Sequence, residues 1–267
     1  MSAAPAEAIG TVVRAIEDEF AKSPPTLAVI GLSGVGKSSV INAMFGTRKK
    51  VSATTRGTIK FRSDTFRIVS DRVDGAPVTC ALRVVDAPGL GEDVARDAGY
   101  LQSYIEQLPR VDIALWVVAA RNRALALDQR YLETLSDVLP SLVLGVGQID
   151  LVEPLDWSEA INMPSAAQEA HIAEILADRR ERLGRIVGAE LPAVAFSARR
   201  YYNLQALFNA CLKCAPPRRR WMFEILKSFS TTDWLDRAKG LSAAQRQKLA
   251  ERYITSDARI RLDDLDR

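Results

Sequence analysis

The stretch GLSGVGKSSV, residues Gly31 to Val40, directly follows the short apolar run LAVI, residues 27–30. It combines several glycines with a lysine, Lys37, and a serine, Ser38, immediately after it. Glycines let the backbone approach a ligand and aim N–H groups at it, a lysine adds positive charge, and a serine hydroxyl can ligate Mg²⁺. The stretch therefore predicts a nucleoside triphosphate site between a buried strand and a helix.

The spacing G-x-x-x-x-G-K-S is that of the P-loop motif. It predicts phosphate contacts from Gly31, Ser33, Gly34, Val35, Gly36, Lys37, Ser38 and Ser39. Lys37 is also expected to stabilise charge on a transferred phosphoryl group, and Ser38 to ligate the metal. Residues 38–46 are typical of a helix that ends at Gly46 as its C-cap. A glycine turn with a surface lysine is the alternative interpretation.

The composition indicates a globular protein without a strong charge bias. The chain has 267 residues, of which 48% are hydrophobic and 26% charged, enough apolar material for one large core. The net charge of +3 gives no concentrated basic face of the kind that binds nucleic acid. The longest apolar run, residues 113–120, is too short to cross a bilayer, and the N-terminal residues lack the pattern of a signal peptide. We therefore expect no transmembrane segment and a cytoplasmic location.

The cysteines do not predict a metal site. Cys211 and Cys214 form a C-x-x-C pair within a helical pattern, but only Cys80 and His171 are available elsewhere to complete a set of ligands. We expect structural thiols and no metal cluster.

Apolar runs alternate with helical patterns along most of the chain. The expected strands are 27–30, 59–61 with 66–70, 81–86, 113–120, 141–146 and 192–196, and the expected helices are 38–45, 94–107, 128–139, 165–187 and 203–214. This alternation predicts an α/β fold with a six-stranded, mostly parallel sheet and helices on both faces. Asp74-Gly75, in the connection between the second and third strands, predicts a hairpin and one antiparallel edge strand.

The chain is expected to comprise an N-terminal amphipathic helix in residues 1–25, a nucleotide-binding domain in 26–215 and a helical C-terminal extension in 216–267. The N-terminal helix is indicated by Ile9, Val12, Val13, Ile16 and Phe20, which recur at helical spacing. After Pro217 only helical patterns follow, and the first of them opens with RRRW.

Two acidic residues at later strand ends bear on which nucleotide binds. Asp86 ends the run VVD and can hold Mg²⁺ through water, and Gly89 offers a backbone N–H to a γ-phosphate.

Asp150 follows the apolar run 141–146. A carboxylate can accept from both N1–H and the 2-amine of guanine, whereas adenine has an acceptor at N1 and no 2-amine. Asp150 therefore favours GTP, and a P-loop ATPase is the alternative.

With these residues in order, the chain resembles the Ras-like P-loop GTPases of the translation-factor class. Within that class it is most similar to Era-like and immunity-related-GTPase-like bacterial proteins over roughly residues 5–214. Asp86 and Gly89 match the family's DxxG motif, and Asp150 matches the last residue of its NKxD motif. The resemblance implies a Ras-like G domain that binds GTP or GDP with Mg²⁺.

The resemblance also assigns roles around the base. Gln148 stands where a lysine usually packs over guanine, and Gly147 replaces the asparagine that braces this loop, which should weaken affinity. The stretch SARRYYNL matches the family's SAxxxxxNL pattern, in which Ser197 steadies the turn and the Ala198 N–H meets the guanine oxygen.

Switch I is expected within residues 49–61, KKVSATTRGTIKF, and the resemblance requires a threonine there that ligates Mg²⁺ and responds to the γ-phosphate. Thr55, followed by an arginine as in Era-type proteins, is preferred. Thr58 lies closer to the next strand and competes with it as the catalytic and metal-binding residue, and Thr54 is third.

Slow hydrolysis is expected, because Leu90 stands where Ras-type enzymes place the glutamine that orients water. A second copy across the nucleotide face or a protein effector would then stimulate turnover. Arg121 and Arg123 are candidates to reach a neighbouring site, and the alternative, which we prefer, is that they only make the surface soluble. The competing interpretation is a nucleotide-gated binding module with negligible hydrolysis. No GxxG loop follows Ala215, so we expect no KH-type RNA-binding module.

Overall fold

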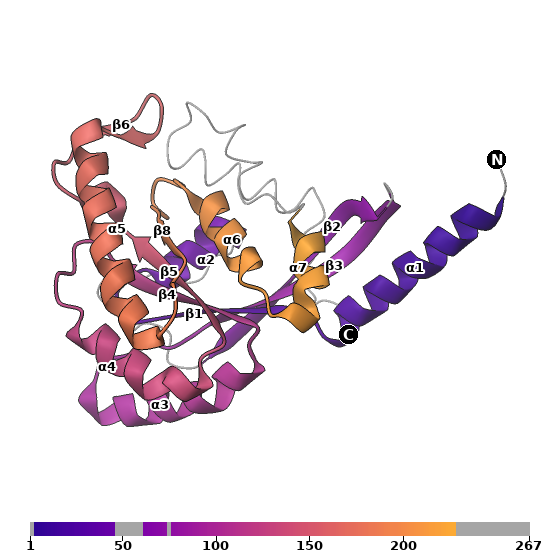
Figure 1. Ribbon diagram of the computed structural model, residues 1–267, viewed down its shortest axis with the longest axis horizontal. Helices are drawn as coiled ribbons and strands as arrows, with labels where there is room; N and C mark the ends of the chain where they lie inside the picture. Colours follow the sequence, from indigo (N-terminus) through magenta and orange to yellow (C-terminus); the bar gives the residue numbers. More distant parts are fainter. Residues whose placement is uncertain (1–2, 46–60, 74–75, 228–267) are drawn as a thin grey trace.

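A computed structural model of the chain describes residues 3–45, 61–73 and 76–227 (Figure 1). Its centre is a six-stranded sheet in the order β2-β3-β1-β4-β5-β8. The strands are β1 Thr26–Ile30, β2 Arg62–Val73, β3 Ala76–Asp86, β4 Ile113–Ala119, β5 Ser141–Gly147 and β8 Ala193–Ala195. A separate two-stranded hairpin consists of β6 Trp157–Ser158 and β7 Met163–Pro164. The predicted α/β fold with six sheet strands is confirmed.

All neighbouring strands of the large sheet are parallel except β2, which pairs antiparallel with β3 at one edge. The predicted hairpin is therefore confirmed, but its connection is shorter than expected. Residues 71–73 extend β2 and 76–80 extend β3, so that only 74–75, which lie outside the described residues, join the two strands. The register shifts between Ser70 and Val73, and the pairing resumes with Val73 opposite Ala76.

Helices cover both faces of the sheet, as the alternation predicted. The α-helices are α1 Ala3–Lys22, α2 Lys37–Phe45, α3 Val94–Gln107, α4 Ala126–Leu135, α5 Ala166–Val187, α6 Leu204–Lys213 and α7 Arg220–Leu226. Short 3₁₀ turns are η1 Leu108–Arg110, η2 Ser136–Val138, η3 Ile149–Leu151 and η4 Pro217–Arg219. The pair α2 and α6 packs on one face, and α3, α4 and α5 lie on the other (Figure 1). The predicted C-cap Gly46 lies outside the described residues.

Local sequence explains the helix boundaries and the core. Asp93 caps α3 by accepting from the Ala95 N–H at 3.0 Å, and Ser165 caps α5 by accepting from the Gln168 N–H at 3.2 Å. β4 is apolar along its whole length because both of its faces are covered, and Trp116 at its centre is fully buried.

The two segments predicted to flank the nucleotide-binding domain meet at the amino ends of the central strands. Phe20 of α1 is buried and contacts the Trp221 ring of α7 edge-on, with 5.8 Å between ring centroids. The Arg219 guanidinium contacts Ser23 and lies 3.5 Å from the Asp112 carboxylate. Both segments thus pack on the common core, and residues 228–267 of the predicted extension lie outside the described residues. Within the described part, no helix combines the length and apolar composition needed to span a membrane.

Candidate nucleotide-binding site

The site is at the edge of the sheet where the parallel strands end. β1 lies between β3 and β4, with Val29 opposite Asp86 and Ile30 opposite Trp116. The carboxyl ends of β1, β3, β4 and β5 therefore meet at one edge, where open parallel sheets bind their ligands. The loop from Gly31 to Gly36 connects β1 to α2, and it needs glycines because residues 31, 34 and 36 have φ between 76° and 133°.

Lys37, the first residue of α2, is held beneath this loop. Its side chain is only 7% exposed, and its Nζ donates to the Leu32 carbonyl at 2.6 Å and the Gly31 carbonyl at 3.0 Å. Burial lowers the pKa of Lys37 to about 8, and the nearby Asp86 carboxylate opposes that shift. A negatively charged ligand beside the ammonium would favour its charged form again.

Ser38 and Asp86 provide adjacent oxygens at the start of α2 and the end of β3. The Ser38 Oγ donates to the Asp86 Oδ2 at 2.9 Å, and Asp86 is 1% exposed. A hydroxyl and a carboxylate side by side are the hard oxygen donors that Mg²⁺ prefers. The predicted metal residues that lie within the described part therefore fit Mg²⁺.

The segment after Asp86 docks directly on the P-loop. The Ser33 N–H donates to the Leu90 carbonyl at 2.9 Å, and the Leu90 N–H donates to the Gly31 carbonyl at 3.3 Å. A Cβ added to Gly89 would lie 2.6 Å from the Ser33 Cα, so no larger residue fits there. The Tyr104 hydroxyl donates to the Pro88 carbonyl at 2.7 Å and holds the segment from its other side.

The third group of predicted residues lies at the ends of β5 and β8. The Ser197 Oγ donates to the Asp150 Oδ1 at 2.7 Å, and Ser197 is fully buried while Asp150 is 9% exposed. Gln148, with φ of 61°, places its Nε2 3.4 Å from the carbonyls of both Gly34 and Val35. The loop that follows β5, residues 148–151, is predicted to face the base and is called the base-side loop below; Gln148 links it to the P-loop. Ala198 follows Ser197 in the turn after β8.

The comparisons with known proteins agree with this arrangement. A family model described as 50S ribosome-binding GTPase matches residues 26–145. GTPase Der of Buchnera aphidicola subsp. Baizongia pistaciae (strain Bp) is 27% identical over 130 residues, which are 47% of this chain and 26% of Der. The crystal structure of Era in complex with MgGDPNP and nucleotides 1506-1542 of 16S ribosomal RNA has a TM-score of 0.52 and 18% identity, and the match covers 72% of this chain and 57% of that one.

The chain contains a P-loop GTPase domain of the Era-like bacterial class. The uncharacterized protein YkfA of Escherichia coli (strain K12) is 33% identical to it over 198 residues, which are 72% of this chain and 62% of YkfA. The chain thus spans less than two thirds of YkfA and of the Era chain.

The structure shows what fills the space at Gly147, where this GTPase domain lacks the family's asparagine. A Cβ added at Gly147 would lie 3.0 Å from the Cζ of Phe196. The phenylalanine ring, which is 2% exposed, therefore occupies the volume that a longer side chain would need. The sequence pattern did not indicate this packing, because residues 147 and 196 meet only across the β5–β8 pair.

Several predicted residues stay untested by the geometry. Thr54, Thr55 and Thr58 of the predicted switch I lie outside the described residues.

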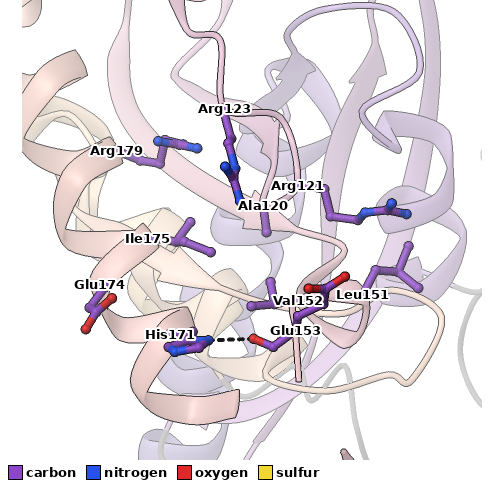
Figure 2. A pocket seen from close by; sticks show the side chains of 10 residues that line it. All are labelled: Ala120, Arg121, Arg123, Leu151, Val152, Glu153, His171, Glu174, Ile175 and Arg179. Carbon is purple, nitrogen blue, oxygen red and sulfur yellow. Dashed lines mark hydrogen bonds between the residues drawn. The ribbon is translucent and has the colours of Figure 1, made fainter. Parts of the chain in front are cut away.

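Arg121 and Arg123 line a cavity of about 540 Å³ together with His171 and Arg179 of α5 (Figure 2). The predicted phosphate contacts are not among the residues lining that cavity, so both arginines belong to the flank of the GTPase domain beside α5.

Cys211 and Cys214 lie on and just after α6 as free thiols, and burial raises the pKa of Cys211 well above its ordinary value. Cys211 is part of the hydrophobic core, as a structural thiol would be.

Proposed function

We propose that this chain binds GTP and GDP together with Mg²⁺, hydrolyses GTP slowly, and works as a nucleotide-dependent switch. The observation that carries the proposal is the hydrogen bond from the Ser197 Oγ to the Asp150 Oδ1. It leaves the second carboxylate oxygen of Asp150 for the base, at the end of a loop that Gln148 ties to the P-loop. A carboxylate in this place pairs with guanine and not with adenine.

The phosphate side of the site supports a triphosphate ligand. The P-loop N–H groups and Lys37 would stabilise negative charge on the β- and γ-phosphates. Ser38 would hold Mg²⁺ directly, Asp86 through water, and Thr55 is the preferred third residue. Mg²⁺, when bound, supplies further charge neutralisation at the phosphates. The Gly89 N–H would meet the γ-phosphate, and the hydrogen bond from the Ser33 N–H to the adjacent Leu90 carbonyl supports this role.

Slow turnover follows from Leu90. Its side chain is fully buried and apolar, so it can neither donate to nor accept from an attacking water. The water must be positioned by another group, and we propose a second copy of this chain or a protein effector as its source. The same burial favours, as a second candidate function, a GTP-gated binding module with negligible hydrolysis.

Nucleotide competition combined with phosphate release tests the proposal. Purified protein is titrated with a fluorescent guanine nucleotide in Mg²⁺, and GTP, GDP and ATP compete for the site. Guanine nucleotides should displace the probe and ATP should not, whereas equal displacement by ATP would refute guanine recognition. Release of phosphate over hours separates slow hydrolysis from the binding module, and Lys37→Ala is the control that should lose binding.

A further inference from the structure

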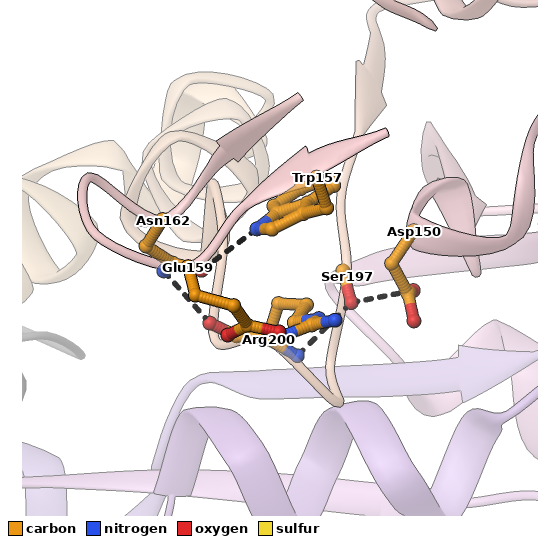
Figure 3. A network of polar contacts seen from close by, with 6 residues as sticks. All are labelled: Asp150, Trp157, Glu159, Asn162, Ser197 and Arg200. Carbon is orange, nitrogen blue, oxygen red and sulfur yellow. Dashed lines mark hydrogen bonds and ion pairs between the residues drawn. The ribbon is translucent and has the colours of Figure 1, made fainter. Parts of the chain in front are cut away.

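We propose that the β6–β7 hairpin positions the carboxylate of Asp150, with Trp157, Asn162 and Arg200 acting as positioning residues for guanine recognition. The proposal rests on the proposed function, in which Asp150 binds the base. Figure 3 shows the network that joins the hairpin to the turn after β8 and to Asp150. In the sequence, the hairpin (residues 157–164) lies between the base-side loop and α5.

A continuous series of hydrogen bonds leads from the hairpin to the carboxylate. The Trp157 Nε1 donates to the Asn162 Oδ1 at 3.1 Å, and the Asn162 Nδ2 donates to the Arg200 carbonyl at 2.9 Å. The Arg200 backbone N–H donates to the Ser197 Oγ at 3.0 Å, and that hydroxyl donates to Asp150. Since Ser197 accepts from Arg200, its own proton is directed at the carboxylate, and the position of Arg200 sets the direction of that bond.

Ring and ion-pair contacts fix the same turn. The Arg200 guanidinium lies 5.8 Å from the centroid of the Trp157 ring and pairs with Glu159 of the hairpin. Trp157 also meets the Tyr202 ring edge-on, with centroids 5.1 Å apart. Tyr202 closes the turn by exchanging backbone hydrogen bonds of 2.9 and 3.1 Å with Ser197. The hairpin thus packs against both ends of the turn that carries the Asp150 partner.

The base-side loop has a specific need for such support. Gly147 contributes no side chain, and the Phe196 ring blocks the space where one could reach across. Gln148 reaches the P-loop carbonyls only at 3.4 Å, which is long for a hydrogen bond. The short hydrogen bond from Ser197 therefore orients the Asp150 side chain, and the hairpin helps to hold Ser197 through Arg200.

Two variants in the hairpin test the proposal, with a matched control in the same hairpin. Asn162→Gly removes the amide but keeps the left-handed conformation, since residue 162 has φ of 52°. Trp157→Phe removes the Nε1–H and keeps an aromatic ring. Ile161→Ala is the control, because Ile161 is 68% exposed at the hairpin. The competition assay compares GDP with inosine diphosphate, which lacks the 2-amine that Asp150 would bind.

The readout is the ratio of the affinities for GDP and inosine diphosphate, which a purely structural role of the hairpin would not change. Asn162→Gly and Trp157→Phe should each lower the preference for GDP over inosine diphosphate by about fivefold, the effect of one hydrogen bond, while Ile161→Ala leaves it unchanged. A wild-type preference that both variants keep within twofold would overturn the positioning role. A wild type that binds both nucleotides equally would instead refute the contact of Asp150 with the 2-amine, and a wild type that binds ATP as well as GDP would refute the proposed function, so the failures are distinct. Thermal melts identify a variant that fails to fold, in which case the other variant decides.

Discussion

Nucleotide binding should take up a proton at alkaline pH because of Lys37. In the free protein burial lowers its pKa to about 8 from 10.5. At pH 7 about nine tenths of the molecules then carry the charged lysine, whereas at pH 9 only about one tenth do. Triphosphate bound to the ammonium should restore the pKa to its ordinary range. Binding should therefore take up about 0.1 proton at pH 7 and about 0.9 at pH 9, and the affinity should fall about tenfold between them.

Titration calorimetry in two buffers with different ionisation enthalpies measures this proton uptake directly. Ile161→Ala is a suitable control, because Ile161 is 68% exposed at the β6–β7 hairpin and its replacement leaves Lys37 and Asp150 in place, so the pH dependence of the uptake should persist. Proton uptake that stays near zero at pH 9 would show that Lys37 is already fully charged in the free protein, and would refute the argument from burial.

The same pKa gives a stability prediction of definite sign. Between pH 8 and 10.5 the unfolded chain binds more protons at this residue than the folded one, so the stability of the free protein should rise with pH across that window. Between pH 8 and pH 10 the free energy of unfolding should rise by about 2 kcal/mol, and urea unfolding of the nucleotide-free protein at these two pH values measures the change. An unchanged free energy of unfolding would contradict the lowered pKa.

Three further predictions concern the loops around the phosphates and the base. Gly89→Ala should reduce the affinity for GTP relative to that for GDP, because the new Cβ would lie 2.6 Å from the Ser33 Cα and push the DxxG segment off the P-loop. An unchanged affinity ratio in the competition assay would contradict this contact. GTP turnover per molecule should be slow at low protein concentration and rise with protein concentration or an added partner, because the buried Leu90 cannot orient water. A fast, concentration-independent rate of phosphate release would mean that another residue of the same chain orients the water. Gly147→Asn should destabilise the protein by roughly 1–3 kcal/mol in urea unfolding, because the Phe196 ring already lies 3.0 Å from the position of a Cβ. An unchanged midpoint of the urea unfolding curve would show that the ring can move aside.

Much of the sheet and of the phosphate site could be predicted because the determining signals are local. The run LAVI, the P-loop glycines and Lys37 are contiguous, and apolar runs such as 27–30 and 113–120 correspond to buried strands. The expected strand at 59–61 was wrong at Phe61, which precedes β2, and residues 59–60 lie outside the described residues. The DxxG residues follow a strand directly, so their position at the carboxyl edge of a parallel sheet follows from topology alone.

The missed features depend on contacts between residues that are distant in sequence. The hairpin β6–β7 has only two residues in each strand, too few for an alternating pattern. Its contact with Arg200 joins residues 38 positions apart, and the Phe196 ring reaches Gly147 from another strand. The stretch DWSEAINMP does contain a weak signal of the hairpin. Trp157 is a large side chain with an N–H donor, and Asn162 is a residue that tolerates the positive φ of a turn.

The most direct test of guanine recognition is Asp150→Asn. Ser197 donates to the Asp150 Oδ1, so the new amide should keep its oxygen toward Ser197 and turn its NH₂ toward the base. That donor opposes the 2-amine of guanine and suits the 2-oxo group of xanthine. Unpaired polar groups can discriminate by up to ~10⁴-fold, and the absence of a side chain at Gly147 should make the effect here smaller.

The measurement is a competition series of GTP, ATP and xanthosine triphosphate against a fluorescent nucleotide, for the wild type and for Asp150→Asn. We predict that the wild type prefers GTP and that the variant prefers xanthosine triphosphate. A ranking that the substitution leaves untouched, or wild-type protein that binds ATP as well as GTP, would contradict the assignment of Asp150 to the base.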